Sequence, residues 1–307
     1  MELFRALAVL VEPPGRPGAA RVAEALGLGA LPEASAYTDT FVFRLYPYAS
    51  VYLGAEGMLG GEARDRVAGF LAALGQVPPP EPDHLALMLG TYARLAEAEG
   101  VESDVQRREY LRGARRAFLW EHLLSWLPVY LDKLAQVAPA FYRRWGELLR
   151  AALDAEAEAL GAQRALPLHL REAPSLADPR ATLSEDTHAP SSEDARTSSS
   201  EDFLRTLLAP ARSGMILVRD DLARVASELG VGLRAGERLY ALRSLMGQDA
   251  AVVLGRLADE AEGWASLHLR RRAAHGQVAE WWAARAASTA RLLRELSADA
   301  REALKTV

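Results

Sequence analysis

The chain contains 307 residues, of which 50% are hydrophobic and 25% are charged, and its formal net charge at pH 7 is −5. A chain of this length and composition can bury one large core or two smaller ones, as globular proteins do. It contains no cysteine, which excludes disulfides, thiolate metal sites and cysteine nucleophiles and agrees with a reducing compartment.

The N-terminal apolar run, Ala6 to Val11, is short and is preceded by Glu2 and Arg5. It has neither the length of a membrane span nor the pattern of a secretory signal peptide. We therefore expect this run to be neither a signal peptide nor a membrane span. The periodic segments that follow are poor in glycine and in β-branched residues, which predicts an all-α fold.

The run from Pro78 to His84 reads Pro-Pro-Pro-Glu-Pro-Asp-His. Prolines favour an extended path and leave few backbone donors to pair, so we expect a stiff surface hinge between two helices. Taken alone, Asp83 is best explained as a cap or first-turn residue of the next helix. His84 alone is best explained as a polar surface group.

The next helix is predicted from apolar residues at three- and four-residue steps, Leu85 to Leu95, and it should end near Gly100. A second helix should open with a capping box of Ser103 and Gln106 and run to Trp126. A spacing of four places His122 and Trp126 on one face, and Pro128 should kink or end the helix. Trp126 alone would be a core residue.

Together these clusters resemble the TorD and DmsD family of redox-enzyme maturation chaperones. That family shows a Glu-Pro-x-Asp-His hinge and a later His-x-x-x-Trp-x-Pro segment, and a Pro-Tyr-x-Ser-x-Tyr segment lies upstream. All three motifs occur here in that order, between about residues 37 and 160. They comprise Tyr48, Ser50 and Tyr52; Glu81, Pro82, Asp83 and His84; and His122, Trp126 and Pro128.

The resemblance implies an all-helical cytoplasmic chaperone for a molybdopterin-dependent oxidoreductase. Such a protein binds the client's twin-arginine signal peptide, its unfolded body or both until the cofactor is inserted, and a homodimer is one option for its assembly. It implies binding and no catalysis, and we expect no cofactor or metal because neither a phosphate loop nor a metal-ligand spacing is present. The expected peptide-binding residues are Tyr48, Ser50, Tyr52, Glu81, Pro82, Asp83, His84, His122 and Trp126.

Charge and composition divide the chain into three parts. Residues 1–172, the expected TorD-like domain, carry 18 basic and 22 acidic groups, and an acidic surface suits a basic peptide better than a phosphate backbone. Residues 173–202 repeat Ser-Glu-Asp at Ser184, Ser192 and Ser200 and should form a disordered linker, with Asp202 capping the helix that follows. Residues 203–307 carry 16 basic and 12 acidic groups and should form a second helical unit.

In this last part we predict helices over residues 203–208, 220–229 and 237–246, and one that runs from Asp249 past Gly263 to about Leu296. Trp264 should pack in a core. Trp281 and Trp282 lie about 100° apart on a helix, so they cannot both face one core. One of them should be partly exposed.

Two other functions compete with the chaperone. Residues 215–246 are similar to the helices of a helix-turn-helix DNA reader, although the second helix offers few basic side chains beyond Arg238 and Arg243. A passive helical scaffold would need none of the three motifs. A separate run, Arg115 to Leu119, matches the core of a twin-arginine export signal, but it lies inside a helix, where we expect its arginines to be solvated.

Overall fold

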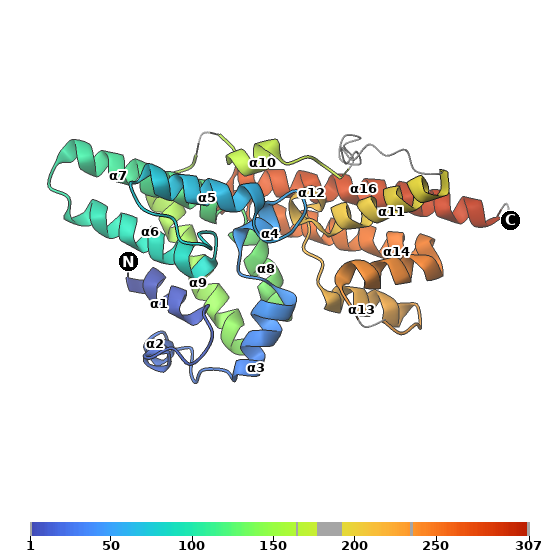
Figure 1. The fold of residues 1–307 in the computed structure, drawn as a ribbon, viewed down its shortest axis with the longest axis horizontal. Helices are drawn as coiled ribbons and strands as arrows, with labels where there is room; N and C mark the ends of the chain where they lie inside the picture. The colour runs from blue at the N-terminus through green and yellow to red at the C-terminus, as the bar shows by residue number, and fades with distance from the viewer. Residues whose placement is uncertain (1, 164, 177–191, 234–235, 306–307) are drawn as a thin grey trace. The chain divides into compact units, whose positions relative to one another are not determined.

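The structure is a computed structural model, and it describes residues 2–163, 165–176, 192–233 and 236–305. Every regular element in these ranges is a helix, which confirms the all-α prediction. None of the described helices combines the length and the apolarity that a membrane crossing requires. The chain folds into two compact units, which are described separately (Figure 1).

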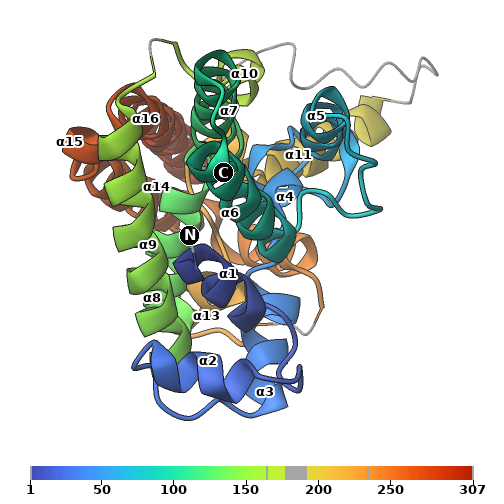
Figure 2. The ribbon, with the colours of Figure 1, turned by 90° about the vertical axis from the view of Figure 1, so that its left-hand side faces the viewer.

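Unit 1 comprises Met1–Gly54, Met58–Arg171 and Ala274–Val278. In it α1 packs against α6 and α9, α6 packs against α7, and α8 packs against α9 (Figure 2). Its elements are α1 (Glu2–Leu10), α2 (Ala19–Ala25), α3 (Ala34–Tyr37), the π-helical η1 (Thr38–Arg44), α4 (Ala49–Leu53), α5 (Gly61–Ala73), α6 (Leu85–Val101), α7 (Val105–Phe118), the π-helical η2 (Leu119–Leu123), α8 (Leu127–Val137), α9 (Ala140–Leu160) and α10 (Leu168–Glu172).

Aromatic side chains fill the core of unit 1. The ring of Phe41 contacts Tyr142 edge to face, with 4.7 Å between centroids, and lies 6.2 Å from Trp145. The indole N–H of Trp145 donates to the carbonyl of Leu7 at 3.0 Å, which ties α9 to α1. These contacts fix α1 against the bundle, a placement that matters for the candidate site.

Two details of unit 1 differ from the sequence predictions. Asp104, not Ser103, caps α7, because its carboxylate accepts from the N–H of Arg107 at 2.8 Å. The helix also does not run unbroken to Trp126: it changes to π-helical geometry at Leu119, and α8 begins at Leu127 with Pro128 in its first turn. Pro128 therefore starts a helix, where its missing N–H costs nothing, and does not kink one.

Arg115 is a further correction. It was expected to be solvated, but its side chain is only 12% exposed and lies 3.1 Å from the Glu99 carboxylate. A charge so far removed from water needs a partner, and Glu99 on α6 supplies it. The ion pair between Arg115 and Glu99 therefore helps to join α7 to α6.

Unit 2 comprises Ala55–Gly57, Glu172–Ala273 and Ala279–Val307. Its core contains Trp264, His268 and Trp282, whose rings lie 5.3 and 5.9 Å apart in sequence order. Trp264 and Trp282 are buried and Trp281 is partly exposed, as predicted. The helices assigned here are α11 (Ser192–Leu208), α12 (Pro210–Ser213), α13 (Arg219–Glu228), α14 (Arg238–Leu269), α15 (Arg272–His275) and α16 (Gln277–Lys305).

The predicted long C-terminal helix starts where expected but is wrong in one place. Its predicted start coincides with a kink of α14 at Asp249 (φ −152°, ψ 87°), where the carboxylate caps the second half of α14 by accepting from the N–H of Val252. However, α14 ends at Leu269, and α16 starts anew after Gly276, whose φ of +50° favours glycine. Periodicity alone could not reveal this break because the sequence on both sides favours helix.

The predicted helix cap at Asp202 needs correction. α11 begins at Ser192, so Asp202 lies inside this helix and does not cap it. Near the N-terminal end of the predicted linker, the N–H of Leu176 donates to the carbonyl of Arg212 at 3.2 Å. Residues 177–191, with the first Ser-Glu-Asp repeat, lie outside the described residues. The division into domains at residues 172 and 202 stays a prediction.

The helix-turn-helix alternative finds little support in this geometry. Residues 229–237 separate α13 from α14, whereas a DNA-reading pair is joined by three or four residues. Arg238 donates to the carbonyl of Leu217 at 2.7 Å, and Arg243 lies 3.3 Å from the Glu201 carboxylate. The two arginines expected to read DNA therefore contact unit 2 itself.

Candidate functional site

The proline hinge connects α5 to α6 and is partly exposed, as its composition predicts. Arg64 on α5 donates to the carbonyl of Pro80 at 3.2 Å, which ties the hinge to the preceding helix. Pro82 is buried, whereas Glu81 is exposed. The hinge thus anchors one of its side chains in the core and presents its neighbour to solvent.

The hinge and the upstream motif form one structure through backbone pairing. The N–H of Ala49 donates to the carbonyl of Asp83 at 3.1 Å, and the N–H of Leu85 donates to Pro47 at 2.8 Å. Tyr48 and His84 thereby lie opposite each other in an antiparallel bridge. Two segments some 35 residues apart are therefore held in one register.

Side chains reinforce this pairing. The hydroxyl of Tyr48 donates to the Glu81 carboxylate at 2.9 Å, and the Tyr48 ring meets that of His84 edge to face at 4.8 Å. Burial, and then this hydrogen bond, raise the pKa of Tyr48 far above its ordinary value. Tyr48 therefore acts as a neutral donor that orients Glu81.

Asp83 and His84 have roles different from those expected when each is taken alone. Asp83 is only 2% exposed, and its carboxylate accepts from the backbone N–H of Ser50 at 3.0 Å. The cap of α6 is His84, whose Nδ1 accepts from the N–H of Ala86 at 3.2 Å. The single-residue explanation of Asp83 as a helix cap is therefore wrong, because its carboxylate is used to hold the upstream motif.

The third motif is buried. Trp126 has no exposed surface, stacks on Tyr52 with ring centroids 5.2 Å apart and 8° between planes, and donates from its indole N–H to the carbonyl of His122 at 2.8 Å. The hydroxyl of Tyr52 donates to the carbonyl of Tyr46 at 2.9 Å. The stacking on Trp126 and the hydrogen bond to Tyr46 hold the Tyr52 side chain of the upstream motif in the core.

Burial separates the predicted site residues into two groups. The exposed group comprises Glu81, which is exposed, and Tyr48 and His84, which are partly exposed. The buried residues support this exposed group. A peptide could contact the buried residues directly only if the structure opened. The buried group comprises Ser50, Tyr52, Pro82, Asp83, His122 and Trp126.

Two histidines in this region have depressed pKa values. Burial lowers the pKa of His84, the carboxylates of Glu81 and Asp83 act in the opposite direction, and the positive charge of Arg16 lowers it further. Deeper burial, with smaller contributions from His169 and Arg66, lowers the pKa of His122 to about 3. At neutral pH His84 therefore presents an uncharged ring.

Glu81 and His84 line a surface pocket of about 500 Å³ in unit 1. One wall is the first half of α6, where Ala86, Gly90 and Arg94 recur every four residues. The lining also includes Arg5 of α1 and Glu12, which lies two residues beyond the end of α1. The complete lining is Arg5, Glu12, Glu81, His84, Ala86, Leu87, Gly90 and Arg94.

Comparison with known proteins bears on this same part of the chain. Residues 19–132 match the sequence model of a family described as nitrate reductase delta subunit. This segment is similar to that family, and the match covers less than half of the chain. It contains all nine predicted site residues, so the delta-subunit match and the three motifs coincide. The resemblance to the TorD-type maturation chaperones is confirmed for this segment.

Individual relatives of the delta-subunit segment are chaperones by name. The chain is 36% identical over 96 residues to "Chaperone protein TorD" of Vibrio cholerae serotype O1, 35% identical over 96 residues to that of Vibrio vulnificus, and 31% identical over 88 residues to that of Photobacterium profundum. The alignments cover 29%, 29% and 27% of this chain and 42%, 44% and 41% of the relatives. The chain thus spans less than half the length of these relatives. No solved structure was found to match it.

The prediction of binding without catalysis agrees with these names, which are those of chaperones. Within the described part of the chain, no three potential ligands lie close enough to hold a metal ion. The three charged pocket residues outside the motifs, Arg5, Glu12 and Arg94, were not found from the sequence. The spacing of Ala86, Gly90 and Arg94 was a signal for the last of them, whereas the other two reach the pocket only through tertiary packing.

Proposed function

We propose that this protein is a cytoplasmic chaperone for a molybdopterin-dependent oxidoreductase. Unit 1 would bind the client's twin-arginine signal peptide beside the hinge and hold the apo form until the cofactor is inserted. The observation that carries the proposal is the pocket in which Glu81 and His84, both from the hinge motif, are accessible together. The TorD chaperones that match this segment support it.

The chemistry of the pocket suits a basic and partly apolar peptide. Glu81 offers a carboxylate already oriented by the hydroxyl of Tyr48, and a charge-assisted hydrogen bond to a guanidinium is stronger than a neutral one. His84, uncharged at neutral pH, can pair with a peptide backbone or side chain without repelling a cation. Ala86, Leu87 and Gly90 leave an apolar surface on α6 for the remainder of the signal.

Binding calorimetry tests this function. The probe is a synthetic peptide that contains Arg-Arg-Ala-Phe-Leu followed by apolar residues, and a second peptide replaces both arginines by glutamine. We expect the wild-type protein to bind the arginine peptide, and Glu81→Gln to weaken that binding about tenfold, because it removes the charge while it retains an acceptor for Tyr48. Glu147→Gln, at an exposed position on α9, is the control.

Two results would count against the proposal. Equal affinity for the arginine and glutamine peptides would remove the ionic basis of recognition. An unchanged affinity in Glu81→Gln would show that the peptide binds elsewhere. Capture of a molybdopterin-type oxidoreductase from the native cytoplasm would test the client class independently, and the predicted homodimer can be measured in the same preparation by sedimentation.

A further inference from the structure

Glu12 is a pocket residue that belongs to none of the three motifs. It lies just after α1, lines the same pocket as Glu81, and its side chain is 22% exposed. The lining of the pocket therefore contains two carboxylates, one from the hinge and one from the segment after α1. Two carboxylates facing one pocket are suited to a planar cation with several donors, which is the chemistry of a guanidinium.

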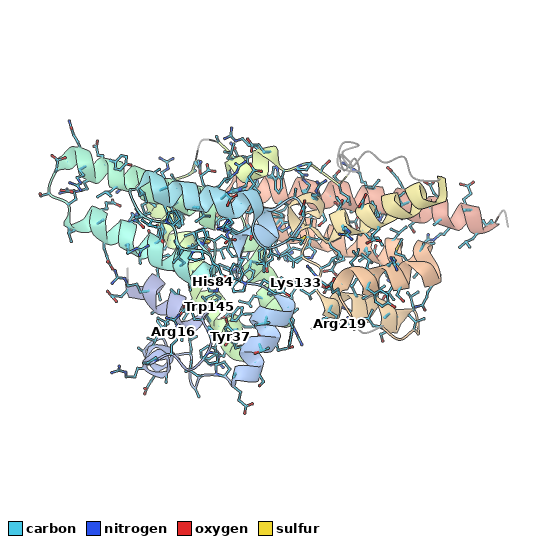
Figure 3. All side chains as sticks on the ribbon, viewed as in Figure 1. Arg16, Tyr37, His84, Lys133, Trp145 and Arg219 are labelled. Atoms are coloured by element: carbon cyan, nitrogen blue, oxygen red, sulfur yellow. The ribbon has the colours of Figure 1, made fainter. Side chains whose placement is uncertain are left out.

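A guanidinium from the chain itself already contacts this carboxylate. The Nε of Arg16 forms an ion pair with Glu12. The positive charge of Arg16 also contributes to the lowered pKa of His84, and both residues are labelled in Figure 3. The carboxylate of Glu12 therefore already binds a guanidinium in the free protein.

The segment that carries Arg16 has a defined backbone and a releasable side chain. Its sequence from Glu12 is Glu-Pro-Pro-Gly-Arg-Pro-Gly, and Gly15 and Gly18 adopt φ values of +124° and +89°. The carbonyl of Arg16 accepts from the N–H of Ala19 at 3.2 Å, so the backbone holds its shape without the side chain. The Arg16 side chain is 60% exposed and can leave Glu12 without any opening of the core.

Arg16 also decides the charge of the pocket. Two arginines and two glutamates line it, and Glu97, which pairs with Arg5, adds a further negative charge. With Arg16 in place these charges balance, and with Arg16 displaced the pocket is net negative. Release of this one side chain therefore makes the pocket more attractive to a cationic peptide.

We propose that Glu12 and Glu81 form a guanidinium subsite, that Arg16 occupies its Glu12 side in the free protein, and that an arginine of the bound peptide replaces Arg16. This inference rests on the proposed function and assigns a specificity-determining role to Glu12. The internal arginine weakens binding of peptides that lack a guanidinium to exchange for it. A peptide with arginine regains the ion pair that it disrupts.

Two variants test the exchange by calorimetry with the peptide that contains Arg-Arg-Ala-Phe-Leu and with its glutamine counterpart. Exposed ion pairs contribute little free energy, so loss of the pair between Arg16 and Glu12 should have a small effect on peptide affinity. Arg16→Gln should bind the arginine peptide about two- to fivefold more tightly at low salt, and this gain should disappear at high salt. Glu12→Gln should bind it about three- to tenfold more weakly and should not weaken binding of the glutamine peptide. Arg205→Gln is the matched control, because Arg205 pairs with Glu201 at the same four-residue spacing and the same 60% exposure in unit 2.

A second measurement does not depend on any peptide. An NMR titration of His84 in Arg16→Gln should show a raised pKa, since a nearby positive charge has been removed. An unchanged pKa of His84 would place Arg16 away from the pocket and overturn the inference.

The binding outcomes separate the two proposals. If the wild type binds the arginine peptide and Arg16→Gln binds it no more tightly, the exchange is refuted and the chaperone function stands. If Arg16→Gln gains affinity and Glu12→Gln loses it, the subsite is supported. If neither the wild type nor Arg16→Gln binds, the proposed function fails and the subsite with it.

Discussion

The carboxylate of Asp83 accepts a hydrogen bond from the backbone N–H of Ser50 at 3.0 Å, and both residues are buried. One motif thus satisfies a backbone donor of another. The hydroxyl of Ser50 continues the connection by accepting from the N–H of Gly60 at 3.1 Å. The acid of the hinge motif therefore stabilises the site in this structure, whereas its neighbours Glu81 and His84 reach the surface.

The first prediction concerns this bond. Asp83→Ala leaves the N–H of Ser50 without an acceptor in the core, so the free energy of unfolding should fall by about 1 to 3 kcal/mol. Asp83→Asn keeps an acceptor oxygen and should cost less. Urea unfolding followed by circular dichroism measures both, and a loss in Asp83→Ala no larger than that in Asp83→Asn would contradict the assignment.

The stack of Trp126 on Tyr52 gives the second prediction. Trp126→Ala removes a fully buried indole and should lower the free energy of unfolding by about 3 to 5 kcal/mol. Tyr52→Phe loses only the hydrogen bond to Tyr46 and should cost about 1 kcal/mol. Tyr110→Ala, which truncates a side chain that is 61% exposed, is the control and should stay within about 0.5 kcal/mol of wild type.

The third prediction concerns pH. Burial lowers the pKa of His122 to about 3, and its ordinary value is 6.5, so between these values the unfolded chain binds a proton that the folded chain does not. Protonation therefore favours unfolding, and the contribution of His122 to stability is lost as pH falls below 6.5, by about 1.4 kcal/mol per unit at most. Above pH 6.5 this effect is absent.

Comparison with His122→Leu isolates this effect from other titrating groups. The stability of the wild type relative to the variant should decline as pH falls from 6.5 towards 4, which chemical denaturation at a series of pH values measures. His169 and Arg66 both act on the pKa of His122, so His169→Gln should weaken the dependence. A constant difference between wild type and His122→Leu over this range would show that His122 is not buried in its neutral form.

Gly214 in unit 2 gives the fourth prediction. Its φ is +76°, and a Cβ atom placed on it would lie 2.3 Å from the backbone nitrogen of Ala286 in α16. Backbone cannot move aside cheaply, so Gly214→Ala should destabilise unit 2 by several kcal/mol, on the order of 3 or more. Its carbonyl also lies 2.9 Å from the ring of His268, so a shift would disturb that contact as well.

Gly263 is the matched control for Gly214. It lies inside α14, and a Cβ atom there would meet nothing within 4 Å. Gly263→Ala should therefore stabilise the protein by about 0.5 to 1 kcal/mol through helix propensity. Thermal unfolding distinguishes the two variants by sign, and equal effects would contradict the close approach at Gly214.

The sequence determined the helical class and most helix positions, because periodicity and turn residues act over a few neighbouring residues. The α6 pattern from Leu85 to Leu95 and the stop of α13 before Gly230 are examples. Prediction from neighbouring residues failed where two adjacent side chains could each cap the same helix. The cap of α6 could have been Asp83 or His84, and tertiary pairing with Ser50 removed Asp83 from the competition.

For the site, the sequence determined which residues come together in the motifs, and only the tertiary structure decided which of them reach solvent. Glu81 and Asp83 are two residues apart, yet one is exposed and the other is 2% exposed. Arg5 and Glu12 belong to no motif, and they join the lining of the pocket through the packing of α1 on α6. Exposure and proximity of this kind depend on contacts between segments far apart in the chain, which local sequence patterns do not encode.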